Sequence, residues 1–250
     1  MYQFFVDDAQ IGKEFITITG SDVNHIKNVL RMKPGEKIRI SNQKGQDYFC
    51  SILELGEDFV QADILDSEAA GTELAAKICL FQALPKGDRM ETVIQKAVEL
   101  GVHEIVPVSM KYCVVKLDAK KAENKRKRWQ AIAESAAKQS KRSLIPVVRE
   151  VMSFKEAVAY AKSFAVNLVP YENERGMAAT REVLEKLKMD DTISVMIGPE
   201  GGFSEEEINQ VKEEKMQIVS LGKRILRTDT AAISTLSMLM LHLEMLEQEQ

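Results

Sequence analysis

The chain has 250 residues, of which 45% are hydrophobic and 29% are charged, and its formal net charge at pH 7 is -4. This composition is typical of a globular protein, and no apolar run approaches the roughly 20 residues that a membrane-spanning helix requires. The acidic balance argues against a protein that coats nucleic acid with its whole surface. The first residues lack the basic and then apolar order of a signal peptide, so we expect a cytoplasmic protein.

The first seventy residues predict short strands separated by turns. Apolar and β-branched residues gather in five segments, at 4–6, 16–18, 37–41, 48–55 and 59–65. One short helix is expected at 22–31, where apolar residues recur with helical spacing. Several short strands with one helix predict a small β-barrel. We therefore expect a first domain over residues 1–70, and the small and polar residues 66–73 predict a linker.

Strand and helix patterns alternate in the second domain, which we place at residues 71–250. Strands are expected at 78–83, 104–108, 164–168, 193–197 and 217–221. Three helices between them have capping-box signals, at Asp88 with Glu91, Ser153 with Glu156, and Ser204 with Glu207. This alternation predicts an α/β fold with a largely parallel sheet covered on both faces. The final helix, at 231–247, is rich in Leu, Met and Ile, which suits either a core or a subunit interface.

Cysteine and histidine are sparse and scattered. They stand at Cys50, Cys79 and Cys113, and at His25, His103 and His242. No pair has the spacing of a zinc site or a redox motif, and three cysteines do not make a disulfide framework. We expect buried structural thiols and no metal site.

Two glycine-bearing loops predict a ligand site. The first is Ile197-Gly198-Pro199-Glu200-Gly201-Gly202-Phe203, and the second runs from Leu221 to Ala231. If their two strands are parallel neighbours, both turns face one crevice at the carboxyl ends of the strands, where α/β sheets bind small ligands. Glycine lets a ligand approach the main chain, and Ile225-Leu226 in the second loop could hold an adenine ring. The pair of loops predicts a nucleoside-type cofactor, whereas the first loop alone is equally compatible with a simple tight turn.

A basic segment lies between the second and third predicted strands of this domain. Residues 111–142 hold eleven Lys or Arg residues against three acidic ones. A run of charge is usually a solvated helix face, but such a face also captures phosphates on an acidic protein.

Five stretches in combination resemble the ribosomal RNA small subunit methyltransferase E family, and the resemblance spans nearly the whole chain. They are residues 25–31, 86–91, 95–102, 197–203 and 221–231. The chain departs from the family's usual residues at Gln3, at Lys111-Tyr112-Cys113 and at Asp229.

The resemblance implies a SPOUT-type methyltransferase domain with a C-terminal trefoil knot, and a PUA-like β-barrel at the N-terminus. It also implies a homodimer with no membrane association. The cofactor would be S-adenosyl-L-methionine, and the reaction would be methylation of N3 of a uridine in 16S ribosomal RNA. The partner would be that RNA within an assembled or assembling small subunit.

The resemblance also assigns residues, because members of the family bind the cofactor mainly through main-chain groups of three loops. The cofactor-binding residues would be Leu168, Val169, Tyr171, Glu172, Ile197, Gly198, Pro199, Glu200, Gly201, Gly202, Leu221, Gly222, Ile225, Leu226, Arg227, Thr230 and Ala231. The RNA-binding residues would be His25, Lys27, Arg31, Lys86, Arg89, Lys125, Arg128, Arg142 and Arg224.

Two residues are candidates for catalysis. Arg227 would stabilise the anion that develops on the uracil carbonyls, and Glu200 would accept or orient the proton of N3. In the alternative, Glu200 only holds its loop and Arg227 only positions RNA.

Two other functions remain open. One is an RNA-binding or ribosome-assembly module without catalysis, which would not need two intact cofactor loops. The other is a SPOUT methyltransferase that acts on another RNA site.

Overall fold

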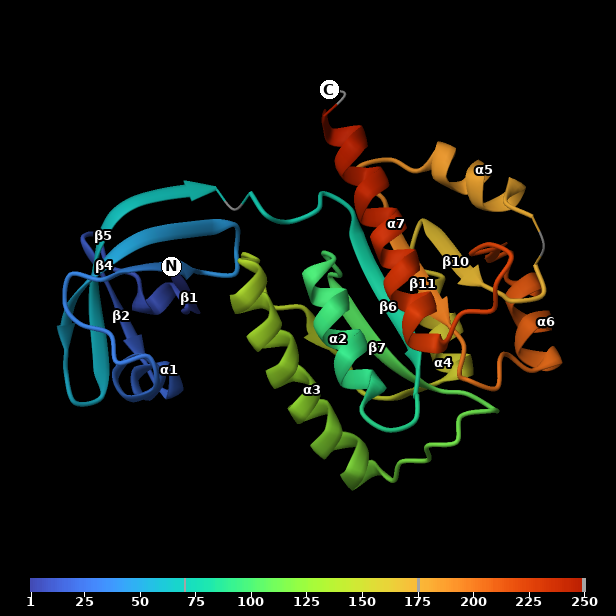
Figure 1. Ribbon diagram of the computed structural model, residues 1–250, viewed down its shortest axis with the longest axis horizontal. Coiled ribbons are helices and arrows are strands. Elements are labelled where there is room, and N and C mark those ends of the chain that lie inside the picture. Colours follow the sequence, from blue (N-terminus) through green and yellow to red (C-terminus); the bar gives the residue numbers. More distant parts are fainter. Residues whose placement is uncertain (70, 175, 249–250) are drawn as a thin grey trace. The chain divides into compact units, whose positions relative to one another are not determined.

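A computed structural model describes residues 1–69, 71–174 and 176–248 (Figure 1). The chain divides into two compact units. Unit 1 contains Met1–Glu73 and Ala137–Ile145, and unit 2 contains Leu74–Ala136 and Pro146–Gln250. The chain thus leaves unit 1, begins unit 2, and returns to unit 1 for one short segment.

Unit 1 is built on a five-stranded sheet with the order β1-β3-β4-β5-β2. The strands are β1 (Tyr2–Phe5), β2 (Phe15–Thr19), β3 (Lys37–Ser41), β4 (Gln46–Leu55) and β5 (Phe59–Ala69). Paired strands are antiparallel except β1 and β3, which are parallel. Alternate residues, such as Ile16 with Ile18 and Ile38 with Ile40, are almost completely buried, as the period of two in a strand requires. All five predicted strands are present, with ends shifted by a few residues.

The predicted helix at 22–31 is present in an altered form. A short 3-10 helix, η1 (Asp8–Gln10), precedes β2, and α1 (Ser21–Asn24) then continues as a π-helical turn, η2 (His25–Val29). Arg31 follows with a φ of 54°, a left-handed conformation that ends the helix. Ile26 is fully buried in the core of unit 1, whereas His25 is exposed.

The predicted linker at 66–73 is wrong at both of its ends. Residues 66–69 extend β5, where they pair with β4, and Ala70 lies outside the described residues. At the other end, the Glu73 carboxylate accepts hydrogen bonds from Arg142 Nε (3.1 Å) and from the N–H of Ser143 (2.8 Å). Glu73 therefore belongs to the packed part of unit 1.

The returning segment is held in unit 1 by buried polar contacts. The Ser143 hydroxyl donates to Asp47 Oδ2 (2.6 Å), and the Ser41 hydroxyl donates to the carbonyl of Ser143 (2.6 Å). The side-chain amide of Gln3 donates to the carbonyl of Arg142. Because these partners are distant in sequence, residues 137–145 are an integral part of this unit.

Unit 2 is built on a seven-stranded parallel sheet with the order β12-β10-β11-β6-β7-β8, in which β9 also pairs with β7. The strands are β6 (Lys77–Ala83), β7 (Glu104–Ser109), β8 (Val147–Val148), β9 (Met152–Ser153), β10 (Val166–Pro170), β11 (Thr192–Ile197) and β12 (Gln217–Val219). The five predicted strands of this domain are present, and β8 and β9 were missed because two residues carry no periodic signal. The strand that ends in the first glycine loop, β11, is not adjacent to β12, because β10 lies between them.

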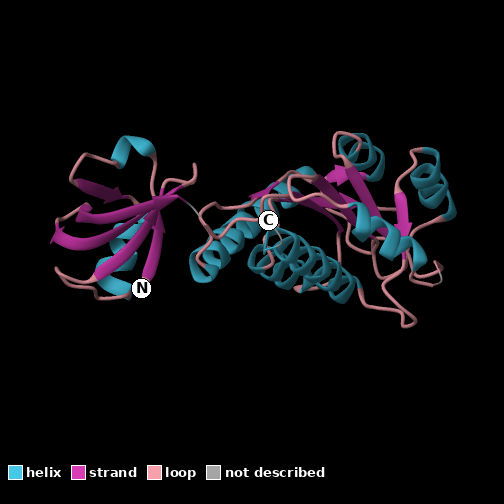
Figure 2. Ribbon diagram, turned by 90° about the horizontal axis from the view of Figure 1, so that it is seen from above, coloured by secondary structure: helices cyan, strands magenta, loops and turns pink. Residues whose placement is uncertain are grey.

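Helices cover both faces of this sheet. They are α2 (Arg89–Glu99), α3 (Ala119–Ser140), α4 (Phe154–Ala161), α5 (Ala178–Lys186), α6 (Glu205–Glu213) and α7 (Thr228–Gln248). Figures 1 and 2 show α2 and α7 on one face, and α4 and α6 on the other. Among the described residues, none of these helices has both the length and the apolar character needed to cross a membrane.

Two of the three predicted capping boxes are confirmed. Ser153 with Glu156 and Ser204 with Glu207 each make both reciprocal hydrogen bonds. The prediction for Asp88 is wrong, because its φ and ψ of -93° and 6° are not extended and its side chain caps no N–H group.

Candidate functional site

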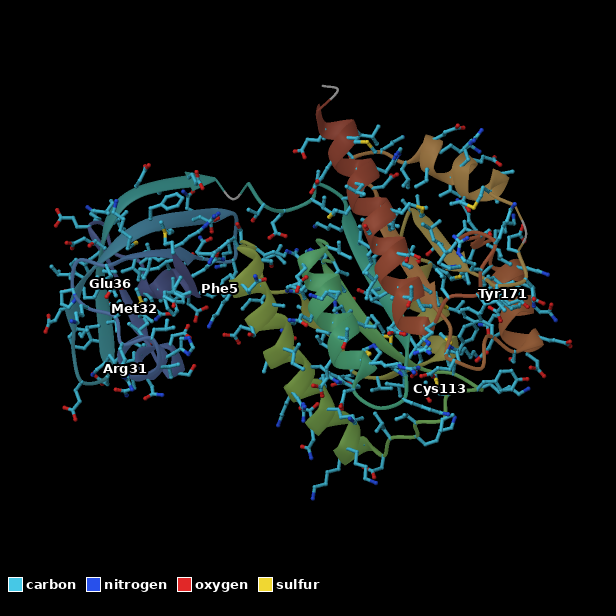
Figure 3. All side chains as sticks on the ribbon, viewed as in Figure 1. Phe5, Arg31, Met32, Glu36, Cys113 and Tyr171 are labelled. Carbon is cyan, nitrogen blue, oxygen red and sulfur yellow. The ribbon has the colours of Figure 1, made fainter. Side chains whose placement is uncertain are left out.

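The loops that follow β10, β11 and β12 line one pocket. These strands are neighbours and parallel, so their carboxyl ends lie at the same edge of the sheet. The loop after β10 contains Tyr171, which is labelled in Figure 3. The lining residues are Pro170, Tyr171, Glu172, Ile197, Gly198, Phe203, Ser220, Leu221, Gly222, Lys223, Arg224, Ile225, Leu226, Thr228 and Ala231.

The loop after β12 offers main-chain N–H groups that have no partner within the described residues. Within the described part of the chain, the N–H groups of Leu221 and of residues 223–227 donate no hydrogen bond to the protein. Gly222, at a φ of 108°, allows the sharp turn that begins this loop. Peptide groups without protein partners along a pocket wall are available to a ligand. Together with the apolar side chains of Ile225 and Leu226, they fit an adenosine.

The loop after β11 has no room for a side chain at two of its glycines. A Cβ on Gly198 would lie 2.8 Å from the ring of Phe203. A Cβ on Gly202, whose φ is 73°, would lie 2.5 Å from Oε1 of Glu172. The main chain therefore passes close to Phe203 in its own loop and to Glu172 in the loop after β10. These close approaches fix this wall of the pocket.

Thr228, the first residue of α7, joins three segments around the pocket. Its hydroxyl donates to the carbonyl of Gly198 (2.7 Å) and accepts from the side-chain amide of Gln82 in β6 (2.9 Å). Thr228 is 5% exposed. The start of α7 is thereby held against the loop after β11.

Most, but not all, of the residues that the resemblance assigned to the cofactor line this pocket. Tyr171, Glu172, Ile197, Gly198, Leu221, Gly222, Ile225, Leu226 and Ala231 line it. Leu168 and Val169 are buried in β10 instead. Pro199, Glu200, Gly201, Gly202 and Arg227 lie in the loops but not in the pocket lining, and Thr230 lies in the first turn of α7, also outside the lining.

Several lining residues were not assigned to the cofactor from the sequence. They are Pro170, Phe203, Ser220, Lys223, Arg224 and Thr228. Each of them lies within, or directly beside, one of the three stretches that the sequence singled out. Only the geometry at the ends of β10, β11 and β12 distinguishes these lining residues from adjacent residues that do not line the pocket.

Glu200 lies outside the pocket lining, and its carboxylate accepts from a main-chain N–H group and from an arginine. Its Oε1 accepts hydrogen bonds from the N–H of Lys86 (3.0 Å) and from Arg89 Nη1 (2.9 Å). Partial burial acts to raise the pKa of this carboxyl group. The hydrogen bonds from the N–H of Lys86 and from its own N–H, together with Arg89, outweigh burial and lower the pKa. Glu200 is therefore a stable carboxylate near neutral pH.

Arg227 differs from Glu200 because its side chain is exposed and uncommitted. It lies between Leu226 and Thr228, both of which line the pocket. Its guanidinium group makes no ion pair or hydrogen bond with any residue that the structure describes. It is therefore free to bind a substrate at the rim.

One residue assigned to RNA is contradicted by its burial. Arg142 is 3% exposed and is paired with Glu73 in unit 1, so its side chain is not available to a phosphate. The sequence placed Arg142 on the basic helix, but α3 ends at Ser140 and the chain then turns into unit 1.

The other assigned cations of unit 2 are accessible to different degrees. Lys86 and Arg224 are exposed, and Arg89 is half-buried in its contact with Glu200. On α3, Lys125 lies over the ring of Trp129, 5.8 Å from its centroid, and exposed Arg128 pairs with Glu91 at 2.8 Å. These positions leave α3 a basic surface.

In unit 1, His25 and Lys27 lie on the π-helical turn, and Arg31 lies two residues after its end. His25 and Arg31 are exposed, and His25 contacts the edge of the Phe4 ring. Lys27 donates to the carbonyls of Gly56 and Glu57, which anchors it to a turn of the same unit.

The three cysteines are free and buried, as predicted. Burial raises the pKa of Cys50 to about 12, and it raises the pKa values of Cys79 and Cys113 as well. Such thiols are poor nucleophiles, so none of them is a candidate for covalent catalysis.

Comparisons with known proteins agree with this geometry. A family model described as an RNA methyltransferase domain matches residues 72–240, and one described as an RNA methyltransferase PUA domain matches residues 18–65. The ribosomal RNA small subunit methyltransferase E of Bacillus subtilis is 37% identical over 237 residues, which cover 94% of this chain and 93% of that protein. Its counterpart in Mesomycoplasma hyopneumoniae is 35% identical over 243 residues, 95% and 98% of the two chains.

A solved structure is also similar over most of the chain. The crystal structure of a ribosomal RNA small subunit methyltransferase E from Neisseria gonorrhoeae, bound to S-adenosyl methionine, superposes with a TM-score of 0.82 at 32% identity. The match covers 95% of this chain and 96% of that one. The predicted α/β fold with a PUA-like N-terminal domain is confirmed.

Proposed function

Because the chain belongs to the ribosomal RNA small subunit methyltransferase E family, we propose that it methylates N3 of one uridine in 16S ribosomal RNA. It is an RNA methyltransferase, and its methyl donor is S-adenosyl-L-methionine. The observation that carries the proposal is the pocket formed by three loops at the carboxyl ends of β10, β11 and β12.

The residues of the pocket suit this cofactor. When bound, S-adenosylmethionine supplies an electrophilic methyl group on a positively charged sulfur. The unpaired N–H groups of Leu221 and residues 223–227 would hold the adenosine part, with Ile225 and Leu226 against the ring. The carboxylate of Glu172 lines the same pocket and is suited to the donor's hydroxyl or ammonium groups.

Arg227 is our candidate for the catalytic residue. Uridine N3 is a poor nucleophile while it keeps its proton, so the site must favour the deprotonated ring. As negative charge develops on the uracil carbonyls, an unpaired guanidinium group at the rim can donate hydrogen bonds to them. Arg227 has the exposure and the freedom for this role.

For Glu200 we propose a positioning role. A carboxylate whose pKa is lowered and whose oxygen already accepts from Arg89 and Lys86 is a weak proton acceptor. It instead ties the loop after β11 to the start of α2. The proton of N3 would then leave to solvent or to another group.

The rest of the proposal concerns assembly and partners. The substrate is 16S ribosomal RNA within an assembled or assembling small subunit, contacted by α3 and by exposed cations of both units. The C-terminal segment of the SPOUT-type domain forms a trefoil knot, and two chains form a homodimer in the cytoplasm. In support of the dimer, α7 exposes Leu241 (52%) and Met245 (58%), an apolar surface that suits a second copy.

Mass-spectrometric mapping of ribosomal RNA from cells that lack this protein tests the function. The expected result is the loss of one methyl group from N3 of one uridine in 16S RNA, restored by the wild-type protein. Loss of a methyl group from a different site would support another RNA target. Calorimetry with S-adenosylmethionine is the second measurement, because a purely RNA-binding module would release no heat.

A further inference from the structure

The loop between β7 and α3, residues 110–118, carries an exposed aromatic ring that the proposed function has not yet used. Tyr112 is 47% exposed, although large aromatic side chains are usually covered. It lies against the loop after β11: a Cβ added to Gly201 would be 3.0 Å from the Cβ of Tyr112. Tyr112 therefore packs on the loop whose residues Gly198 and Phe203 line the cofactor pocket.

Hydrogen bonds hold the main chain on the N-terminal side of this ring. The N–H of Lys111 donates to Glu207 Oε1 (2.9 Å), and Lys111 Nζ pairs with Glu206 Oε2 (2.8 Å). Glu207 is buried and also accepts the N–H of Ser204 at the start of α6. The residue before Tyr112 is thus bound to the first turn of a helix.

The residue after Tyr112 is anchored on the other side. The N–H of Cys113, labelled in Figure 3, donates to the carbonyl of Met110 (3.1 Å), which closes a tight turn. The Cys113 side chain is 4% exposed. The two residues that flank Tyr112 are therefore both held in place, and they fix the main chain from which the ring projects.

One cation lies beside the ring, Lys111, which is also paired with Glu206. Lys111 Nζ lies 6.0 Å from the centroid of the Tyr112 ring. The loop continues into α3, whose first half contains Lys120, Lys121 and Lys125. An aromatic face beside cations is the combination that binds unpaired nucleotides, because the ring stacks on a base while the cations bind the phosphates.

We propose that Tyr112 stacks on an unpaired RNA base next to the reacting uridine and so positions that uridine at the cofactor pocket. The inference rests on the proposed function and deepens it, since it names a residue that selects single-stranded RNA. Tyr112 acts as a positioning residue and takes no part in the transfer itself.

The test compares Tyr112→Ala, Tyr112→Leu, Tyr112→Phe and Tyr112→Trp in the full-length protein. The substrate is small ribosomal subunits purified from cells that lack this methyl group. We expect Ala and Leu to raise KM for the subunits, and Kd by filter binding, about tenfold. The value of kcat and the affinity for S-adenosylmethionine should stay within about twofold. Phe and Trp should restore KM, because they keep an aromatic face.

The Leu variant separates stacking from packing, because leucine replaces the apolar bulk but not the ring. Val114→Ala is the matched control: Val114 is 63% exposed on the same loop and should leave KM unchanged. A Leu variant with wild-type KM, or an Ala variant with wild-type KM and Kd, would overturn the inference.

The two proposals fail in different ways. If the wild-type protein transfers no methyl group but the Ala and Leu variants still bind subunits less tightly, the proposed reaction is wrong and the stacking role stands. If transfer by the wild type is normal and all variants match it, only the stacking role is wrong. If the wild type does not bind subunits at all, both are wrong.

Discussion

At position 200, the contacts of one carboxylate decide which chemistry it can perform. Arg89 and the N–H of Lys86 stabilise the charged form of Glu200, so it is deprotonated throughout the range in which enzymes usually work. Within the residues that the structure describes, Arg227 on the next loop has no such partner. Both residues lie in pocket loops without lining the pocket, but only the arginine side chain is without a partner among the described residues and so able to respond to a substrate.

Replacing Arg227 should therefore slow methyl transfer. We expect Arg227→Ala to lower kcat by about 10²-fold, the usual effect of removing one group that stabilises a developing anion. Affinity for S-adenosylmethionine should be unchanged by calorimetry. Arg181→Ala, which removes an exposed arginine from α5, is the control. Near-wild-type turnover in Arg227→Ala would exclude a catalytic role.

The pH dependence tests Glu200. Because its pKa is lowered, its stabilising contacts are present above the ordinary glutamate value of about 4.3 and are lost as the pH falls below it. Glu200 does not titrate between pH 6 and 9, so Glu200→Gln should keep the wild-type shape of the kcat profile in that range. A limb of the profile that disappears in the Gln variant would show that Glu200 accepts the proton.

At the scale of the elements, the first residue of α7 has a role that the apolar composition of this helix does not reveal. Thr228 binds the carbonyl of Gly198 and the amide of Gln82, so the start of the helix aligns two of the three pocket loops. Thr230, in the same first turn, is exposed. The two threonines form a matched pair for mutation.

We expect Thr228→Val to lower the free energy of unfolding by about 1–3 kcal/mol, because it leaves the Gly198 carbonyl and the Gln82 amide without their partner. It should also weaken S-adenosylmethionine binding. Thr230→Val should change both quantities little. Urea unfolding and calorimetry measure the two effects, and equal behaviour of the two variants would contradict the assigned role.

The basic surface of α3 should control RNA affinity through phosphate contacts. Lys125→Glu with Arg128→Glu should weaken binding to small subunits and make the dependence of log K on log salt less steep by up to about two units. Lys188→Glu with Lys212→Glu, which makes the same charge change elsewhere on unit 2, is the control. An unchanged salt slope in the α3 variant would exclude this helix from the RNA interface.

Local signals in the sequence identified the elements, whereas contacts between distant residues determined the site. Ser204 and Glu207 are three residues apart, so their capping box could be predicted. The position of β10 between β11 and β12 could not, because strand order depends on pairing across the sheet. Arg142 looked like a surface cation because its partner, Glu73, lies 69 positions earlier in the chain.

At the scale of the whole molecule, the return of the chain to unit 1 ties the fold of that unit to residues from the middle of the sequence. The Arg142 side chain is 4% exposed and that of its partner Glu73 is 19% exposed, so the ion pair is largely removed from water. Removing one partner of such a pair leaves a buried charge without compensation.

Glu73→Ala should therefore lower the stability of unit 1 by about 3–5 kcal/mol. In hydrogen exchange, the amides of β3 and β4 should lose protection, while those of β6 and β11 should not. Glu123→Ala breaks a more exposed pair with Arg126 on α3 and should cost less than about 1 kcal/mol. Equal losses in the two variants would contradict the importance of the buried pair.

The bond between Thr228 and the Gly198 carbonyl also bears on how the protein is made. The cofactor pocket draws its walls from Pro170 through Ala231, and the last of them arrives with the final helix. During synthesis, a chain that has not yet reached Thr228 and Ala231 lacks part of the pocket wall, so it has no finished place for the methyl donor.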